Sequence, residues 1–402
     1  MLKKILKISS ITILTFMLLG FAFLFGTNLG YQLRVVAAEI IMSSQHRGLV
    51  KLTFLPQEEV DSILKSIQNP EVENTHDSSL NWDILQSIQS QEQGKKTSTQ
   101  ELIDIFERRQ AERGITQAME NNDLALAEEI KKEYETKISS NQNSKLVVSV
   151  EDIEGTYSDH FFKGKMATIS NPFNVGLELS SGKQISSEYG EQLNFIAQTN
   201  NGILATNASG FVDENGVGNG GTPIGIVIND GQHIADPGGT FAKANVAGIT
   251  NEGLLISGDY STDELLALGV QEAAGFKPQL ISNGEKIPME GNGGWGYGPR
   301  TAIGQKADGS IVLVVIDGRQ THSVGASIID LQEIMYNAGV VNAMTMDGGS
   351  SALMYFNGKN ITTPSSVKNI PRYIPNAWVV KAKTGQEVEI YENGQLINSY
   401  TQ

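Results

Sequence analysis

The sequence of 402 residues contains no cysteine. This absence excludes disulfide bonds, thiolate zinc sites and a cysteine nucleophile together. Any nucleophile or metal ligand in this protein must therefore carry oxygen or nitrogen. The lack of cysteine also suits an exported bacterial protein.

Basic residues are scarce relative to acidic ones, with 30 Lys and Arg against 45 Asp and Glu and a net charge of −15. Nucleic-acid-binding proteins gather Lys and Arg on one face, so this balance argues against a polyanion-binding surface and predicts no nucleic-acid partner. A phosphate contact in this protein has to be local. Histidine is also rare, and no metal-ligand spacing is found among His46, His76, His160, His233 and His322.

Long apolar runs are missing except for one at the N-terminus. Residues 8–29 carry no charge, and as a helix they would span roughly 33 Å, close to the thickness of the hydrocarbon core. Three lysines precede this run, which places residues 1–7 in the cytoplasm by the positive-inside rule. We expect a signal-anchor and a single-pass cell-membrane protein whose C-terminal part is extracellular. A signal peptide cleaved near residues 36–38 is the alternative.

Residues 30–145 are polar and show no sustained heptad repeat, which argues against a long coiled coil. Apolar residues recur at helical spacing in places, for example at Ile84, Leu85 and Ile88. We therefore predict a helical spacer that holds the C-terminal domain away from the membrane. A partner-binding or self-associating stalk is the alternative, and the oligomeric state stays open.

From residue 146 the sequence switches to β-branched and alternating runs. These runs lie at 146–150, 224–228 and 311–316. The last is followed by a helical stretch at 326–337, by Gly339 as a C-cap and by a further apolar run at 340–346. This order predicts a βαβ-like unit inside an α+β domain that is built on a mixed β-sheet and covers residues 146–402.

Two of the apolar runs end in an aspartate followed by a glycine: VIDGR with Asp317, and TMDGGSS with Asp347. Ligands in α/β units bind at the carboxyl ends of strands, so these two side chains are expected to share one crevice. After Asp347, Gly348 and Gly349 let a backbone approach a ligand closely, and Ser350 offers a hydroxyl. An Asp-Gly pair also makes ordinary turns, and this interpretation stays open, above all for Asp317.

A third segment, GGWGYGPRTAIG, places Arg300 between a glycine-rich loop and a predicted strand. The planar guanidinium matches a phosphate or a carboxylate, although a surface ion pair is the simpler alternative. Trp295 and Tyr297 in this loop offer apolar faces on which a sugar ring can pack, or are simply buried. In a fourth segment, ATNASGF, Asn207 and Ser209 are candidates for hydrogen bonds to a polar ligand.

Several known motifs fail in their context. The glycines at 291–296 fit a dinucleotide-binding pattern but neither follow a strand nor open a helix. Residues 213–219 depart from the calcium-loop pattern because Val217 occupies a ligand position. Residues 348–352 lack the final glycine of a nucleophile elbow, so a serine hydrolase is poorly supported. No cofactor is predicted, and a calcium or magnesium ion held by the aspartates stays an alternative that no spacing requires.

The order of the segments resembles one protein family. NASGF, GPRTAIG, VIDGR, MDGGSSALMYFNG and IPRYIPNAWVV follow one another within residues 195–382. This order is similar to that of the phosphodiester glycosidases related to the lysosomal uncovering enzyme, and of bacterial relatives described as exopolysaccharide biosynthesis proteins. The resemblance adds Arg372, which precedes the last strand, to the candidate polar positions. The resemblance does not extend to residues 1–145.

The resemblance implies hydrolysis of a sugar-1-phosphodiester in a cell-surface or extracellular polysaccharide or a related glycoconjugate. Under this hypothesis Arg300 and Arg372 hold the phosphodiester and stabilise its developing charge. Asp347 activates water or stabilises an oxocarbenium-like centre, while Asp317 positions sugar hydroxyls or serves as a second carboxylate, so inverting and retaining chemistry are both open. A glycosyl-phosphate transferase of exopolysaccharide assembly and a non-catalytic wall-polymer binding protein are the alternatives.

Overall fold

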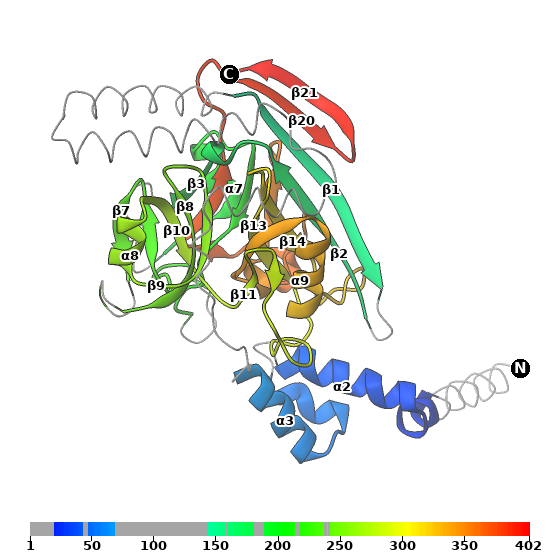
Figure 1. Cartoon of the computed structure of the whole chain (residues 1–402). Coiled ribbons are helices and arrows are strands. Elements are labelled where there is room, and N and C mark those ends of the chain that lie inside the picture. The colour runs from blue at the N-terminus through cyan, green and yellow to red at the C-terminus, as the bar shows by residue number, and fades with distance from the viewer. Residues whose placement is uncertain are drawn as a thin grey trace, which may run out of the picture.

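The computed structural model of the chain describes residues 20–42, 47–68, 144–156, 160–180, 189–213, 218–236, 239 and 242–402. Figure 1 shows two parts: a large sheet-rich body that contains the C-terminus, and a smaller unit of helices on the N-terminal side. The body contains both strands and helices, which confirms the predicted α+β class. Most of the predicted spacer, residues 69–143, lies outside the described residues.

The largest sheet has nine strands in the order β12-β11-β15-β13-β14-β2-β1-β20-β21. In chain order they are β1 (Leu146–Thr156), β2 (Phe161–Ile169), β11 (Gln279–Ser282), β12 (Glu285–Lys286), β13 (Arg300–Lys306), β14 (Ile311–Ile316), β15 (Val340–Met346), β20 (Glu387–Glu392) and β21 (Gln395–Thr401). Neighbouring strands are antiparallel except β1 and β20, which run parallel. The sheet is therefore mixed, as the sequence predicts.

Two smaller sheets have five strands each, in the orders β17-β16-β5-β19-β3 and β7-β6-β10-β8-β9. The first consists of β3 (Val175–Leu179), β5 (Leu204–Asn207), β16 (Met354–Phe356), β17 (Lys359–Asn360) and β19 (Asn376–Val380). The second consists of β6 (Val227–Asn229), β7 (Gln232–Ala235), β8 (Ala244–Thr250), β9 (Leu255–Tyr260) and β10 (Val270–Gly275). A two-stranded ribbon joins β4 (Glu191–Gln192) to β18 (Tyr373–Ile374). The strand predicted at 224–228 begins only at Val227, because Gly225 has a φ of +90° that an extended strand does not allow.

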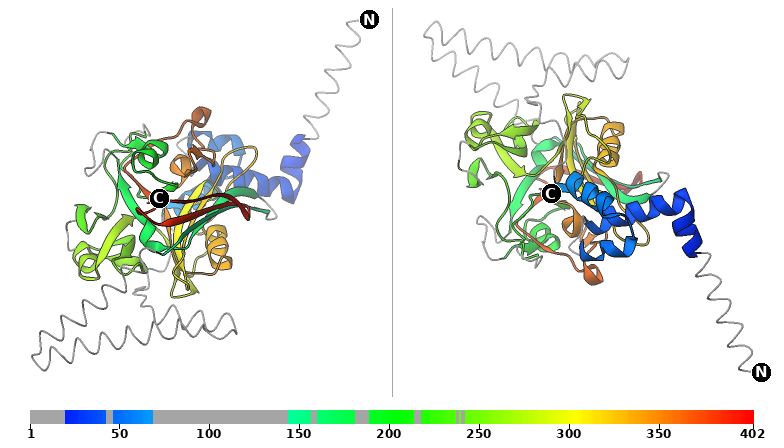
Figure 2. Two further views of the ribbon diagram at one scale, coloured as in Figure 1. Left: turned by 90° about the horizontal axis from the view of Figure 1, so that it is seen from above. Right: turned by 90° about the horizontal axis from the view of Figure 1, so that it is seen from below.

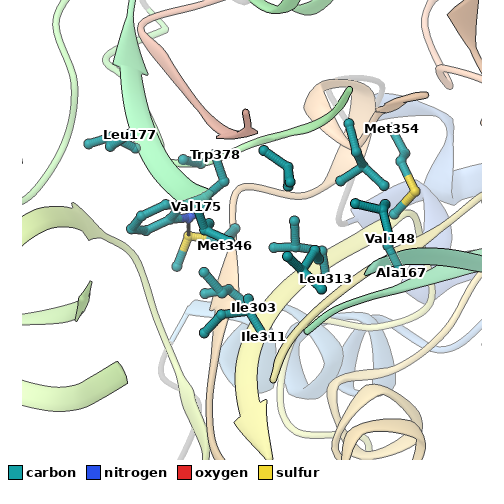
Figure 3. Packing of buried hydrophobic residues seen from close by; sticks show 14 of the residues in the cluster. Val148, Ala167, Val175, Leu177, Ile303, Ile311, Leu313, Met346, Met354 and Trp378 are labelled. Atoms are coloured by element: carbon teal, nitrogen blue, oxygen red, sulfur yellow. Dashed lines mark hydrogen bonds between the residues drawn. The ribbon is translucent and has the colours of Figure 1, made fainter. Parts of the chain in front are cut away.

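Apolar side chains from all three of these larger sheets meet in one core. Figure 3 shows Trp378 of β19 beside Met346 of β15, and the Trp378 indole N–H donates to the Met346 sulfur at 3.2 Å. Leu313 of β14 lies in the same core and is completely buried. Because interiors are close-packed, this core fixes the ends of β5, β13 and β15 relative to one another.

Helix α9 (Ile328–Asn337) covers the opposite face of the nine-stranded sheet. It begins with a capping box, in which the Ser327 hydroxyl accepts the Asp330 N–H and the Asp330 carboxylate accepts the Ser327 N–H. It begins at Ile328 rather than at the predicted residue 326, because Ala326 pairs with Gly298, and it ends at Asn337 as predicted, where Gly339 follows with a φ of +76°. The shorter helices are α7 (Leu193–Thr199), α8 (Thr262–Ala267), η2 (Pro172–Asn174), η4 (Gly349–Ser351) and η5 (Val367–Asn369).

The predicted βαβ-like unit is present as β14, α9 and β15. Strand β13 lies between β14 and β15 and is antiparallel to both. The two outer strands therefore run in the same direction and end at the same edge of the sheet. Both faces of β14 are covered, since its odd residues enter the central core and its even residues pack under α9, which explains its unbroken apolar sequence.

The N-terminal unit consists of α2 (Asn28–Met42), η1 (Arg47–Thr53) and α3 (Gln57–Gln68). Figure 2 shows it on one side of the sheet-rich body. It touches the body at Gly296, where an added Cβ would lie 3.2 Å from the Glu39 carbonyl oxygen. The predicted membrane span lies largely outside the described residues, and its described part bends at Thr27. Within the described residues, none of the helices combines the length and the apolar character needed to cross a membrane.

Candidate active site

Strand topology brings three of the predicted residues to one edge of the large sheet. Arg300 begins β13, Asp317 follows the end of β14, and Asp347 follows the end of β15. In the register, Arg300 is opposite Ile316, and Thr301 is opposite Met346. The two aspartates thus flank Arg300 at one sheet edge, with backbones roughly 10 Å apart across two inter-strand spacings.

Asp347 is the most strongly perturbed carboxyl group at this edge. Burial raises its pKa to about 6, against an ordinary value of 3.8. The Ser351 hydroxyl, the positive charge of Arg372 and the Gly348 N–H all oppose this rise, while the charge of Asp213 adds to it. A carboxyl group that titrates near pH 6 can exchange a proton near neutral pH, as acid–base catalysis requires.

Arg300 lies behind the loop that precedes it. Its Nε donates to the Ala326 carbonyl at 2.9 Å, and its Nη2 donates to the carbonyls of Trp295 at 2.9 Å and Gly296 at 2.5 Å. Burial and the neighbouring charge of Arg319 lower its pKa to about 9, so it stays a cation at neutral pH. Most of its N–H donors therefore bind backbone carbonyls of the protein. Its guanidinium lies beside Gly348 in the turn that follows Asp347.

Arg319 is a site residue that sequence inspection missed. It follows Asp317 and Gly318 with a φ of +58°, and burial lowers its pKa. Its guanidinium lies over the turn after Asp347, because a Cβ added at Gly349 would be 3.4 Å from its Nη1. The signal was present in the segment VIDGR, whose arginine stands two residues after the candidate aspartate.

Arg372 contacts the same turn at Ser350. Its Nη1 donates to the Ser350 hydroxyl at 3.2 Å, and its Nη2 forms an ion pair with Asp213. Its guanidinium also lies 4.8 Å from the centre of the Phe211 ring. These contacts hold the guanidinium in one orientation beside Asp347. Asp213, the second missed residue, follows the predicted segment ATNASGF by two positions.

Two glycines shape the turn between these arginines. A Cβ on Gly348 would lie 2.9 Å from the Pro299 carbonyl oxygen, and Gly349 has a φ of +61°. The Gly349 N–H also donates to the Pro299 carbonyl at 3.0 Å. Larger residues would push the turn away from the start of β13, so the backbone needs glycine here; the predicted close approach to a ligand stays a prediction.

The Asp317 carboxylate is engaged on both oxygens. Oδ2 lies 2.9 Å from Nε2 of His322, and Oδ1 accepts the Thr363 N–H at 2.8 Å. Its side chain is 11% exposed, whereas that of His322 is 40% exposed. Asp317 therefore ties the loop after β14 to the segment after β17, and its predicted role toward a sugar or as second carboxylate stays a prediction.

Asn207 and Ser209 are buried and bonded within the protein. The Asn207 Nδ2 donates to the Asp347 carbonyl at 2.6 Å, and its Oδ1 accepts from the Thr301 hydroxyl at 2.9 Å. Asn376 bonds both the Ser209 N–H and the Ser209 hydroxyl, at 2.9 and 3.1 Å. Both residues therefore hold the backbone in place around the site. Asn207 does so by joining the end of β5 to the backbone of Asp347.

Trp295 and Tyr297 lie in the loop that holds Arg300. Trp295 supplies a carbonyl to that arginine, and its ring centre lies 6.0 Å from that of Phe276. The Tyr297 ring lies 4.1 Å from the His160 ring, which in turn contacts Asp330 at 2.9 Å. Their predicted contact with a sugar ring stays a prediction.

A metal site is not formed by these side chains. Among the described residues, no group of three His, Asp or Glu side chains is arranged to hold a metal ion. The positive charge that acts on Asp347 comes from an arginine, Arg372, which suits an anionic ligand.

A carboxyl group of raised pKa among three arginines, at the edge of a mixed sheet, is typical of an enzyme site for an anionic ester. Residues 200–381 match the sequence model of the phosphodiester glycosidase family, so this part of the chain is similar to that family. The resemblance predicted from the motifs is thereby confirmed. The matched range includes Asp213, Arg300, Arg319, Asp347 and Arg372.

Two relatives illustrate the similarity. Human N-acetylglucosamine-1-phosphodiester alpha-N-acetylglucosaminidase is 28% identical over 207 residues, which are 46% of this chain and 39% of the human protein. The SPbeta prophage-derived uncharacterized protein YomE of Bacillus subtilis (strain 168) is 28% identical over 180 residues, or 42% of this chain and 27% of that protein. The chain thus spans less than half the length of these curated relatives.

A solved structure shares the fold. It is the zebrafish N-acetylglucosamine-1-phosphodiester alpha-N-acetylglucosaminidase catalytic domain, auto-inhibited by its pro-peptide, with a TM-score of 0.51 and 22% identity. The match covers 59% of this chain and 84% of the zebrafish chain.

Proposed function

We propose that this chain is an extracytoplasmic hydrolase that cleaves the bond between a sugar and a phosphodiester in a cell-surface or extracellular polysaccharide or a related glycoconjugate. The human and zebrafish relatives are named for an N-acetylglucosamine-1-phosphodiester, which supports this substrate class. The outside location rests on residues 8–29 of the sequence, which we propose anchor the chain with its C-terminal domain outside the membrane.

The observation that carries the proposal is the pKa of about 6 for Asp347 beside the Arg372–Asp213 pair. The carboxylate is largely ionised above that pH and can accept a proton from water or stabilise positive charge at an anomeric carbon. Two charges act on it, those of Arg372 and Asp213. Both Asp213 and Asp317 are held by a side chain and a backbone N–H, but Asp213 raises the pKa of Asp347, so we propose Asp213 as the second carboxylate.

The arginines can bind the phosphate and stabilise its negative charge. A phosphodiester leaving group departs as a stable anion, so it needs charge stabilisation more than protonation. Arg372 and Arg319 flank the turn after Asp347 with oriented guanidinium groups, and Arg300 adds a third positive charge from behind the loop. Preorganised donors of this kind contribute several kcal/mol to transition-state stabilisation.

The reaction balances as a simple hydrolysis. Water adds its oxygen to the anomeric carbon, and the bond from that carbon to the phosphate oxygen breaks with its electron pair going to the phosphate. One water proton passes to Asp347 and is then released. The products are a free sugar and a phosphomonoester.

The full-length chain in detergent should release both products from an N-acetylglucosamine-1-phosphodiester. Sugar and phosphomonoester are measured separately, with and without an acceptor alcohol, so that transfer is distinguished from hydrolysis. Asp347→Asn should reduce the rate about 100-fold or more. Binding of the phosphodiester without any product would contradict the proposal and favour a non-catalytic polymer-binding protein.

A further inference from the structure

Exposed apolar side chains are concentrated on the N-terminal unit. Of the 22 large apolar residues that are exposed in the described part of the chain, ten lie between residues 21 and 54. The most exposed of these ten are Leu52 at 67%, Phe54 at 66% and Phe21 at 60%. Single exposed apolar residues are ordinary on a protein surface, but a cluster of this density marks an interaction surface.

A network around Arg34 joins the chain segments that carry these residues. Its Nε donates to the Leu24 carbonyl at 3.2 Å, and its Nη1 donates to the Phe54 carbonyl at 3.0 Å. The chain bends tightly here, because a Cβ on Gly30 would lie 2.2 Å from the Phe23 carbonyl oxygen. The helical residues 20–26, helix α2 and the end of η1 are thereby joined.

Aromatic rings cover the junction between these elements. The Phe21 and Phe25 rings stack with centres 4.3 Å apart, and Phe54 meets Phe25 edge-on at 5.7 Å. Phe54, which follows η1 directly, therefore belongs to the same apolar surface as residues 20–26. We call this surface the apolar patch and define it by Phe21, Phe25, Leu49, Leu52 and Phe54.

The apolar patch is separate from the unit's own core. That core is formed by Ala38, Met42, Val60 and Ile63, all of which are buried. Leu49 and Leu52 of η1 remain exposed at 50% and 67%, although folding has ordered the chain around them. These side chains are left for a partner outside the unit.

Charge identifies the chemistry of that partner. The whole chain has a charge of −15, whereas η1 carries Arg47 and Lys51 and no acidic residue; apart from Glu39, the acidic residues of the unit lie on α3. Arg47 and Lys51 are exposed beside Leu49 and Leu52. Basic residues next to exposed Phe and Leu are the pattern by which proteins bind an anionic lipid surface.

We propose that the apolar patch inserts into the interface of an anionic lipid bilayer, so that η1 lies in the membrane surface and the N-terminal unit holds the sheet-rich body beside it. The patch also continues directly from the apolar sequence that ends at residue 29, which favours lipid over a second copy of the chain. Membrane contact would then include residues 49–54 as well as the apolar run at residues 8–29. It is independent of the proposed hydrolysis.

The absence of cysteine gives a clean experiment. Leu52→Cys in the full-length chain is labelled with an environment-sensitive fluorophore and reconstituted into vesicles of phosphatidylcholine and phosphatidylglycerol. The matched control is Leu396→Cys, which is also an exposed leucine, at 52%, but lies on β21 at the opposite end of the molecule. Both variants share any anchor in residues 8–29, so the readout is the depth of the label and not binding itself.

The fluorescence of the label at position 52 should shift to shorter wavelength in the vesicles. Most of its intensity should be lost when the lipids carry nitroxide quenchers on their acyl chains. The label at position 396 should show neither effect. Equal, water-like emission at both positions would overturn the proposal. A blue shift at position 52 without quenching by lipid would also overturn it, because it would indicate a protein partner. Leu49→Cys repeats the measurement if the first variant loses its unfolding transition.

Discussion

At the scale of single residues, the proposed role of Asp347 predicts that activity depends on pH. A role as base or as charge stabiliser needs the carboxylate, and burial raises the pKa of this group to about 6. We therefore predict that kcat/KM rises as the pH increases through about 6. A profile that is flat between pH 5 and 7, measured with a substrate that does not titrate there, would remove Asp347 from that role.

The same shift predicts a gain in stability for an inactive variant. The pKa of Asp347 in the folded state lies above its unfolded value of 3.8, so ionisation of Asp347 destabilises the folded state. This destabilisation is absent below pH 3.8 and complete above about pH 6. A rise from 3.8 to about 6 corresponds to roughly 3 kcal/mol as an upper limit. Asp347→Asn should therefore be more stable than the parent at pH 7 and lose this advantage near pH 4. Chemical unfolding at both pH values measures the difference.

Arg372 tests the phosphate contact. Arg372→Lys keeps the charge, but one ammonium group cannot reproduce a planar guanidinium that meets Asp213 and Ser350 together. We predict a loss of about 100-fold in kcat/KM for the phosphodiester. The control is Arg47→Lys on the exposed N-terminal unit, which should leave the rate unchanged. Comparable rates for the two variants would show that the guanidinium plane is unimportant.

Single residues were partly predictable from the sequence. Asp347 and Arg300 stand next to glycine-rich segments, and this local pattern was visible. The Asp213–Arg372 pair joins positions 159 apart, so no local spacing indicates it. Asn207 illustrates the same limit, because its polar side chain fits a ligand site in sequence but bonds the backbone of Asp347 in the structure.

At the scale of elements, the turn after β15 tests how closely backbone must approach the ligand. Gly349→Ala and Gly291→Ala introduce a side chain at φ values of +61° and +60°, which should cost about 1–2 kcal/mol of stability in each case. Only Gly349 lies against Arg319, while Gly291 faces open space. We predict that both variants lose similar stability but only Gly349→Ala loses activity. Equal activities would place the turn outside the reaction.

The β14–α9–β15 unit was predictable because each element carries its own signal. The apolar runs, the glycine cap and the helical spacing are local features. The insertion of β13 between the two strands was not predictable, because strand order follows from pairing between distant segments. That insertion places Arg300 between Asp317 and Asp347.

At the scale of the whole molecule, the shared core joins the three larger sheets into one folding unit. Leu313→Ala removes a completely buried side chain from this core and should cost about 2–5 kcal/mol, with a single unfolding transition. Leu396→Ala on the exposed edge strand should change stability by less than about 0.5 kcal/mol. Two separate transitions in the Leu313 variant would mean that the sheets unfold independently.

The arrangement of the whole molecule followed least from the sequence. Composition predicted an anchored, polar spacer before a mixed-sheet domain, and the described residues include helices at 28–42 and 57–68. The contact of α2 with the loop holding Arg300 could not be predicted, because it joins Glu39 to Gly296, far apart in the sequence. The exposure of the apolar residues at 49–54 was also not predictable, because their spacing does not distinguish surface positions from core positions.

The most direct test of the account compares two substrates that differ only in the phosphate. The full-length chain is given a sugar-1-phosphodiester and the simple glycoside of the same sugar and the same alcohol, and kcat/KM is measured for both. Because Arg319 and Arg372 flank Asp347, the account predicts strong preference for the phosphodiester, and Arg372→Lys should lose most of that preference. Equal or faster cleavage of the simple glycoside would contradict the assignment of these arginines to phosphate.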